Sequence, residues 1–109
     1  MDTIEERYIS NAQGDWRIRL VPDSDAKPFD ADCYSAEDIE AWRKDEWSYV
    51  GVIVTDSKTG ADAFLWAVEY GLMPEATIGI NQIIEEYFDD LRAEVLAQLA
   101  ERAAELTAQ

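Results

Sequence analysis

Histidine is absent from the sequence, and its absence removes the commonest general base of enzymes along with Ser-His-Asp and Cys-His catalytic sites. The single cysteine, Cys33, cannot form an internal disulfide, which is typical of proteins in a reducing compartment. Basic residues are scarce: nine Lys and Arg stand against 24 Asp and Glu, giving a net charge of -15. Because nucleic acids and anionic membranes are bound through clustered Lys and Arg, neither is expected as a direct partner.

Long apolar runs and glycine-rich motifs are missing as well. No stretch approaches the about 18 apolar residues of a membrane span, and the first residues lack the basic and apolar regions of a signal peptide. The chain contains neither a P-loop nor a dinucleotide-binding fingerprint. These absences predict a soluble cytoplasmic protein that is not an enzyme and needs no cofactor.

An acid-rich loop at residues 23–34 raises the question of a calcium site. An EF-hand loop starting at Asp23 would need an oxygen ligand at its fifth position, glycine at its sixth and glutamate at its twelfth. The sequence has Lys27, Pro28 and Tyr34 at these positions. The loop is therefore predicted to be solvated, and no metal site is expected.

The sequence does contain enough apolar material for a folded core. Hydrophobic residues make up 48% of the chain, with four Trp and five Tyr among 109 residues. Disordered acidic segments are poor in aromatic residues, so we expect the acids to decorate a folded body. The length predicts a single domain over residues 1–109.

Three segments have the patterns of β-strands. Apolar residues alternate with arginines over residues 15–21, which predicts a strand with one buried face. Residues 47–55 form a nearly continuous apolar run, typical of a central strand covered on both faces. A turn-forming segment ending in Gly60 leads into a third strand over residues 61–70, so the last two strands form a hairpin. Trp16 and Trp66 are expected in the core.

Two helices complete the predicted fold. Ser35 and Asp38 have the spacing of a capping box, which predicts a short helix over residues 35–44. From residue 80 to residue 107, apolar residues recur every three or four positions, which predicts one long amphipathic helix. The expected fold is therefore α+β: a small three-stranded antiparallel sheet packed by a short helix and a long C-terminal amphipathic helix.

The long helix would overhang such a sheet. Its residues span about 42 Å at about 1.5 Å per residue, whereas a six-residue strand spans about 20 Å. The N-terminal segment could cover the overhanging apolar stripe, the end could fray, or a second copy could cover it in a two-fold homodimer. The residues predicted for self-association are Val95, Leu96, Leu99 and Leu106.

Acidic residues gather in the middle segment and along the last helix. Adjacent carboxylates such as Glu85 and Glu86 could in principle perform acid–base catalysis, but the exposed side of a helix is more typical of a solvated face. An acidic surface of this kind attracts and steers a basic partner. The residues predicted to bind that partner are Asp30, Asp32, Glu37, Asp38, Glu85, Glu86, Asp89, Asp90 and Glu94.

The predicted hairpin also carries a family resemblance. Residues 47–55 read Trp-Ser-Tyr-Val-Gly-Val-Ile-Val-Thr, residues 65–71 read Leu-Trp-Ala-Val-Glu-Tyr-Gly, and residues 41–43 read Ala-Trp-Arg. This region resembles a group of small acidic proteins encoded by phages of actinobacteria. In that group glycine usually follows the Leu-Trp pair, whereas Ala67 stands there in this chain. The resemblance implies a phage protein in the host cytoplasm, where such proteins often disable host factors, including nucleic-acid-handling defence enzymes; it implies no site residue.

Two classes of function therefore stay open. In the first, the chain is a non-enzymatic interaction protein that binds a basic surface of a host protein. The most specific version of this hypothesis is an inhibitor that mimics nucleic acid. In the second, it is a homo-oligomerising structural or assembly module whose acidity serves only solubility. The two classes differ in their response to salt and in the oligomeric state that they require.

Overall fold

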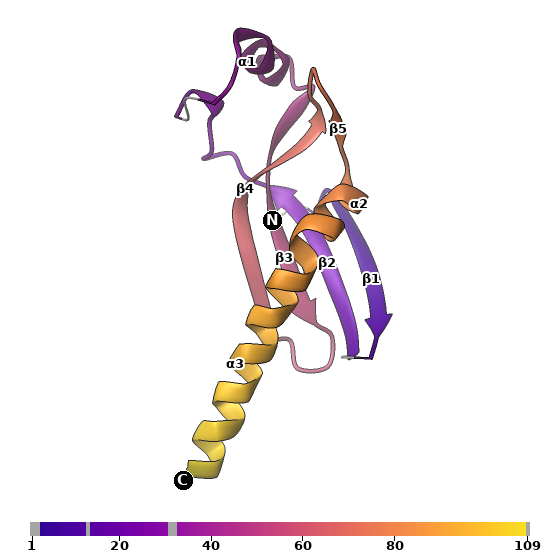
Figure 1. Ribbon diagram of the computed structural model, residues 1–109, viewed down its shortest axis with the longest axis vertical. Helices are drawn as coiled ribbons and strands as arrows, with labels where there is room; N and C mark the ends of the chain where they lie inside the picture. The colour runs from indigo at the N-terminus through magenta and orange to yellow at the C-terminus, as the bar shows by residue number, and fades with distance from the viewer. Residues whose placement is uncertain (1–2, 13, 31–32, 109) are drawn as a thin grey trace.

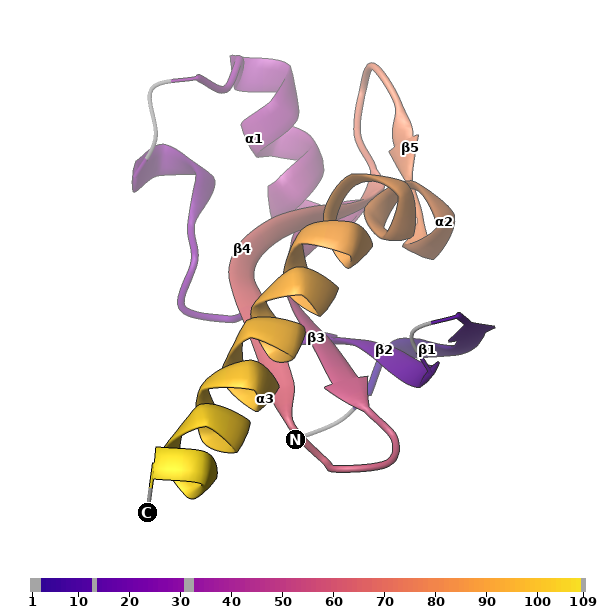
Figure 2. The ribbon, with the colours of Figure 1, turned by 60° about the horizontal axis from the view of Figure 1, so that its bottom comes forward.

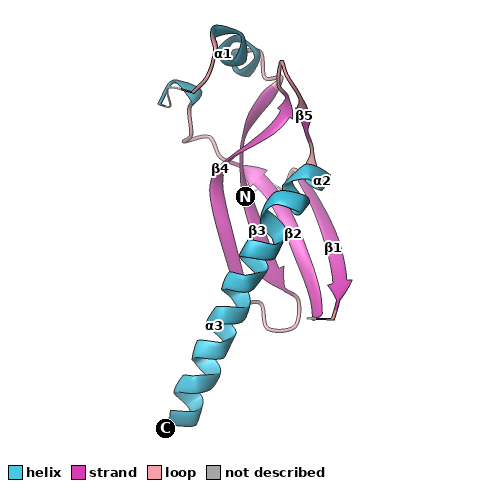
Figure 3. Ribbon diagram, viewed as in Figure 1, coloured by secondary structure: helices cyan, strands magenta, loops and turns pink. Residues whose placement is uncertain are grey.

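The fold is that of a computed structural model, which describes residues 3–12, 14–30 and 33–108, without the side chains of residues 30, 107 and 108. The chain is α+β, with a curled antiparallel sheet and a long C-terminal helix (Figures 1 and 3). Five strands follow one another in the order β1-β2-β3-β4-β5. Their bounds are Glu5–Asn11, Gly14–Pro22, Trp47–Asp56, Asp62–Leu72 and Thr77–Ile78.

The prediction of three strands was therefore wrong in its detail, because the sheet gains a strand at each edge. β1 pairs with β2 over its whole length, with Tyr8 opposite Arg17. Its sequence, Glu-Glu-Arg-Tyr-Ile-Ser-Asn, has too few apolar residues to show a buried face. β5 is only two residues long, and it pairs with β4 at Gly71 and Leu72. So short a strand leaves no pattern to detect.

The helices lie close to where they were expected. α1 spans Ala36–Arg43, and the predicted capping box at Ser35 is present: the Asp38 amide donates to Ser35 Oγ at 3.2 Å. The C-terminal helix starts as α2 at Ile80–Ile83, passes through a π-helical turn at Ile84–Phe88, labelled η2, and continues as α3 over Asp89–Ala108. A short 3₁₀ turn, η1, lies at Pro28–Asp30.

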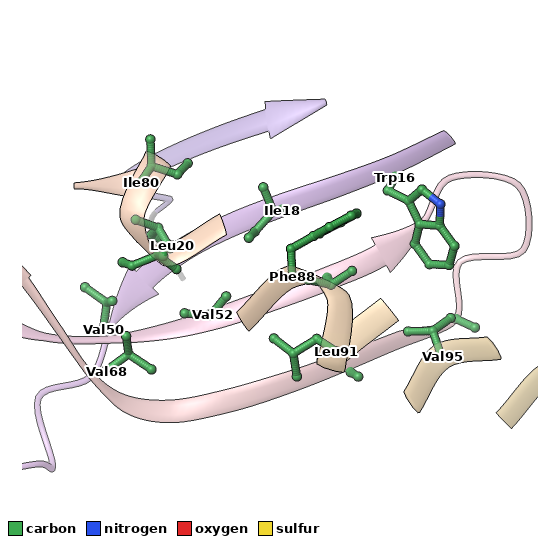
Figure 4. Close-up of a cluster of buried hydrophobic side chains, with 14 residues drawn as sticks. Trp16, Ile18, Leu20, Val50, Val52, Val68, Ile80, Phe88, Leu91 and Val95 are labelled. Atoms are coloured by element: carbon green, nitrogen blue, oxygen red, sulfur yellow. The ribbon is translucent and has the colours of Figure 1, made fainter. Parts of the chain in front are cut away.

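The main core lies between one face of the sheet and the C-terminal helix. Figure 4 shows side chains of β2 and β3, such as Ile18 and Val52, pointing towards Phe88 and Leu91 of the helix. The Trp16 ring meets the Phe88 ring edge-on, with centroids 6.4 Å apart. Since Trp16, Ile18, Val52 and Val95 are at most 1% exposed, the helix seals this face of the sheet over the length that it crosses.

The π-helical turn explains how the helix meets the core. Ile83 and Phe88 are both buried, although they are five positions apart and a regular α-helix brings positions three and four apart to one face. A turn with one extra residue places both side chains on the sheet side. It also turns Glu85 and Glu86 outward, where both are exposed.

The other face of the sheet is covered only at one end. Trp47 and Tyr49, near the start of β3, pack under Ala41 of α1 and Tyr34. Further along β3 no helix covers this face among the described residues (Figures 1 and 2). The strand was expected to be covered on both faces, and this holds for its first half alone. Trp66 was expected in the core but is 41% exposed; its ring lies over Gly51 on the uncovered face.

Ala67 has an unusual backbone conformation, with φ of +59° in the left-handed region. It lies where β4 shifts register against β3, and its amide donates to Asp23 Oδ2 at 2.8 Å. An L-residue in this region is strained by about 1 kcal/mol relative to glycine.

Replacing Ala67 with glycine is therefore expected to stabilise the protein by up to about 0.5 kcal/mol, because the strain that it relieves exceeds the entropy that glycine adds to the unfolded chain. Urea unfolding followed by tryptophan fluorescence measures this. Ala63→Gly in the same strand is the matched control, because Ala63 is buried and has no positive φ. That control should lose about 1 kcal/mol; equal losses in both variants would contradict the strain at Ala67.

The molecule is elongated, with principal extents of 56 × 26 × 23 Å. Near the end of the stretch that the helix shares with the sheet, Gln98 Nε2 donates to the Asp62 carbonyl oxygen at 3.0 Å, and Leu99 packs against the core. Residues 100–106 are all exposed. The end of α3 therefore projects beyond the hairpin of β3 and β4, as Figure 1 shows.

Candidate interaction site

A row of exposed carboxylates runs along the outer side of the C-terminal helix. We call it the acidic ridge, and its members are Glu85, Glu86, Asp89, Asp90 and Glu94. Spacings of four residues place these side chains on neighbouring turns of one side. One basic partner lies within reach among the described residues: Arg92 Nη2 is 3.3 Å from Asp89 Oδ1. The other four carboxylates have no ion pair in the described part of the chain.

Beside the ridge, a hollow of about 350 Å³ opens between the helix and strands β4 and β5. Glu69 of β4 and Glu86 of the helix stand at its walls with Tyr87, and Val68 and Ile83 line it with apolar surface. Burial, followed by the nearby charges of Glu86 and Glu69, raises the pKa of Tyr87. The same two charges would favour a cation in this hollow.

A second hollow of about 300 Å³ adjoins the first and shares Glu69 with it. Asp38 of α1 and Glu75 of the turn between β4 and β5 line this hollow together with Tyr34. We call the two hollows together the acidic groove. Four carboxylates line it, and no Lys or Arg of the described residues does.

A hydrogen-bond network holds Glu69 in the groove. The Tyr34 hydroxyl donates to Glu69 Oε2, and the Tyr49 hydroxyl donates to the Tyr34 oxygen at 2.8 Å. Tyr34 in turn stacks on the buried Trp47 ring, with centroids 5.4 Å apart. Burial and the hydrogen bond to Glu69 raise the pKa of Tyr34, so its proton stays on the phenol. Glu69 is thus a fixed acceptor on a rigid strand rather than a mobile surface acid.

The structure brings together part of the predicted partner-binding set. The five helix acids form the ridge, and Asp38 reaches the same groove as Glu86. Glu37 lines a different hollow, beside Lys44 and Glu46. Asp32 lies outside the described residues, and so does the side chain of Asp30.

The sequence reasoning missed four residues of the groove. Glu69 offered a signal, since a carboxylate in the middle of an apolar strand is expensive unless it has a partner or a task. No such signal in the sequence marked Tyr34, Glu75 or Tyr87, because these residues come together only through strand β5, which was not predicted.

The predicted self-association residues do not lie together on one exposed surface. Val95 is fully buried against its own sheet, so it is not available to a second copy. Leu99 is half-buried and packs against the same core. Leu96 and Leu106 are exposed, Leu106 by 77%.

Comparisons with protein-family models, with curated proteins and with solved structures give no match. In the described part of the chain, no three carboxylate or thiol groups come together as a metal site. The described helices include none that is long and apolar enough to cross a membrane. The groove and the ridge are therefore the features from which a function can be inferred.

Proposed function

We propose that the protein is a non-enzymatic interaction protein that binds a basic surface of another protein through the acidic groove and the acidic ridge. The observation that carries this proposal is the concave site lined by Asp38, Glu69, Glu75 and Glu86, with no cation among the described residues that line it. Its shape suits a Lys or Arg side chain, because the apolar wall takes the methylene stem and the carboxylates take the charged head. The Tyr87 ring adds a face for a cation.

The ridge extends this site along the helix and favours a partner that itself binds nucleic acid. Between Glu85 and Glu105 the helix carries seven carboxylates over about 30 Å, or one per about 4 Å. Duplex DNA has one negative charge per about 1.7 Å of its axis, so these seven helix carboxylates supply less than half of that charge density. The groove acids add to it at one end. In this proposal the protein is phage-encoded, acts in the host cytoplasm, and competes with nucleic acid for a basic site.

The proposal predicts that removing the groove carboxylates weakens binding to a cationic probe. In the double variant Glu69→Gln with Glu86→Gln, the dissociation constant for a fluorescent Arg-rich peptide is expected to rise about tenfold, or about 0.7 kcal/mol for each carboxylate. Fluorescence anisotropy measures this. For the intact protein the affinity should fall steeply with added salt, because exposed charges are screened.

The matched control is Glu40→Gln with Glu46→Gln, which removes the same charge around a different hollow at the end of α1. We expect this pair to change the dissociation constant by less than about threefold. Equal losses in both pairs would mean that net charge alone attracts the peptide. Binding that is insensitive to salt would contradict the proposal altogether.

A further inference from the structure

The uncovered half of the sheet is an unusual surface for so acidic a chain. Tyr8, Phe64 and Trp66 lie there with 69%, 58% and 41% of their surface exposed. The register places Arg19 beside Ile53 and Ile53 beside Phe64, so apolar and basic side chains share this surface. We call it the outer sheet face. Large exposed aromatic groups beside arginine are typical of protein interfaces.

Two buried polar atoms on the outer sheet face have no hydrogen-bond partner among the described residues. They are Arg19 Nε and Thr55 Oγ1. Among the described residues, no carboxylate lies within 4.0 Å of Arg19, whereas Arg17 on the same strand forms an ion pair with Glu6 at 2.5 Å. The Arg19 charge therefore has no acidic partner among the described residues, and an acidic occupant of this face would supply one.

The same chain carries a segment that fits this face. Beyond Leu99, the nine residues 100–108 of α3 project past the sheet over about 13 Å. The uncovered part of β3, from Gly51 to Thr55, measures about 14 Å. Leu106 lies two turns beyond the core-packed Leu99 and so on the same side of the helix. Glu101 and Glu105 lie one turn apart on this segment, and their carboxylates can supply the acidic partner that Arg19 lacks.

We propose that a second copy of this chain covers the outer sheet face with the projecting end of its α3. Each helix leaves its own sheet at the β3–β4 hairpin. A two-fold axis beside this hairpin lets each helix continue over the outer sheet face of the other copy, so the two contacts are equivalent. Leu106 of one copy then packs on Phe64 and Trp66 of its partner, and each helix spans both sheets.

Two charge-introducing variants test this pairing. Leu106→Asp alters the helix end, Phe64→Asp alters the outer sheet face, and both residues are exposed, so neither variant disturbs a core. Light scattering on the intact chain is expected to give twice the monomer mass. Each variant should weaken dimerisation at least tenfold, whereas Leu72→Asp, exposed at the other end of β4, should leave it unchanged.

An equimolar mixture of the two variants is the decisive measurement. A mixed pair places both substitutions in one contact and leaves the other contact intact, so the mixture should dimerise more tightly than either variant alone. A dimer that is insensitive to Phe64→Asp would mean that helices meet helices, and one insensitive to Leu106→Asp would mean that sheets meet sheets. Either result, a monomeric wild-type protein, or no recovery in the mixture overturns the proposal.

Salt separates this dimer from binding to a cationic partner. Two copies that each carry a charge of -15 repel one another, so dimerisation should tighten as salt is added, up to about 1 M, where the Debye length is about 3 Å. Attraction to a cationic peptide weakens over the same range. A dimer that dissociates on addition of salt contradicts the proposed contact.

Discussion

Replacing Gly71 with alanine is expected to destabilise the protein by about 3 kcal/mol or more, a large effect for the addition of one methyl group. Gly71 has φ of +120°, a conformation that residues with a Cβ atom rarely adopt. An added Cβ would lie 2.6 Å from the Glu46 carbonyl oxygen and 2.8 Å from Trp47 Cα. Both are backbone atoms of the segment that enters β3, and the Glu46 carbonyl already accepts from the Leu72 amide at 2.7 Å.

Gly14 offers a closely matched control for this substitution. Its φ is +121°, but no described heavy atom lies within 4 Å of the position that its Cβ would take. Gly14→Ala is therefore destabilised by the backbone conformation alone, about 1–2 kcal/mol, and the difference between the two variants measures the steric clash. Urea unfolding at neutral pH gives both values. Equal costs would show that β3 and β4 move apart to accept the methyl group.

Stability is expected to fall sharply above pH 10. The hydrogen bond to Glu5 and then burial raise the pKa of Tyr70 to about 12, and burial also raises the pKa values of Tyr34 and Tyr87. A folded pKa above the unfolded value of about 10 means that the folded state holds its protons more tightly. The resulting stability is fully present below about pH 10 and is lost as the pH rises towards and through the folded values. Tyr70 alone should account for a loss on the order of 1–2 kcal/mol by about pH 12.

The variant Tyr70→Phe tests the assignment of this alkaline loss. It removes the bond from the Tyr70 hydroxyl to Glu5 Oε2, which measures 2.6 Å, and should cost about 1 kcal/mol at neutral pH. From about pH 10 upward, its unfolding free energy should decline less steeply than that of the wild-type protein. Parallel pH profiles for the two proteins would exclude Tyr70 as a cause.

The parts of the fold that could be predicted from the sequence are those with a regular period or a helix-capping motif. The alternation of Trp16, Ile18 and Leu20 marks β2, and the Ser35–Asp38 pair marks the start of α1. β1 was not predicted because an edge strand can be polar on both faces. Its charged residues Glu5, Glu6 and Arg7 protect that edge of the sheet from pairing with another strand.

Trp66 shows why composition misleads about burial. A tryptophan in an apolar strand is expected inside, but the register against β3 places it opposite the core side, over Gly51. The face that a strand buries depends on pairing and on the bulge near Val50 and Val52, which local sequence does not reveal.

Of the candidate site, the acidic ridge could be predicted from the sequence and the acidic groove could not. The acidic ridge follows from helical spacing, since residues four apart share a side whatever the rest of the fold does. The groove depends on β4, β5, α1 and the helix meeting at Glu69, and no local pattern encodes a meeting of four elements. The extra residue of the π-helical turn likewise shifts which side chains of the helix face outward.

The projecting end of α3 has a hydrodynamic consequence. A body with extents of 56 × 26 × 23 Å tumbles and diffuses more slowly than a sphere of equal mass. On a gel-filtration column a single copy would elute early, at the volume of a larger compact protein. Rotation of the molecule about its short axes would be slower than rotation about its long axis, and this would slow the decay of tryptophan fluorescence anisotropy. Frictional drag in solution thus reports whether the helix end is extended or folded back against the sheet.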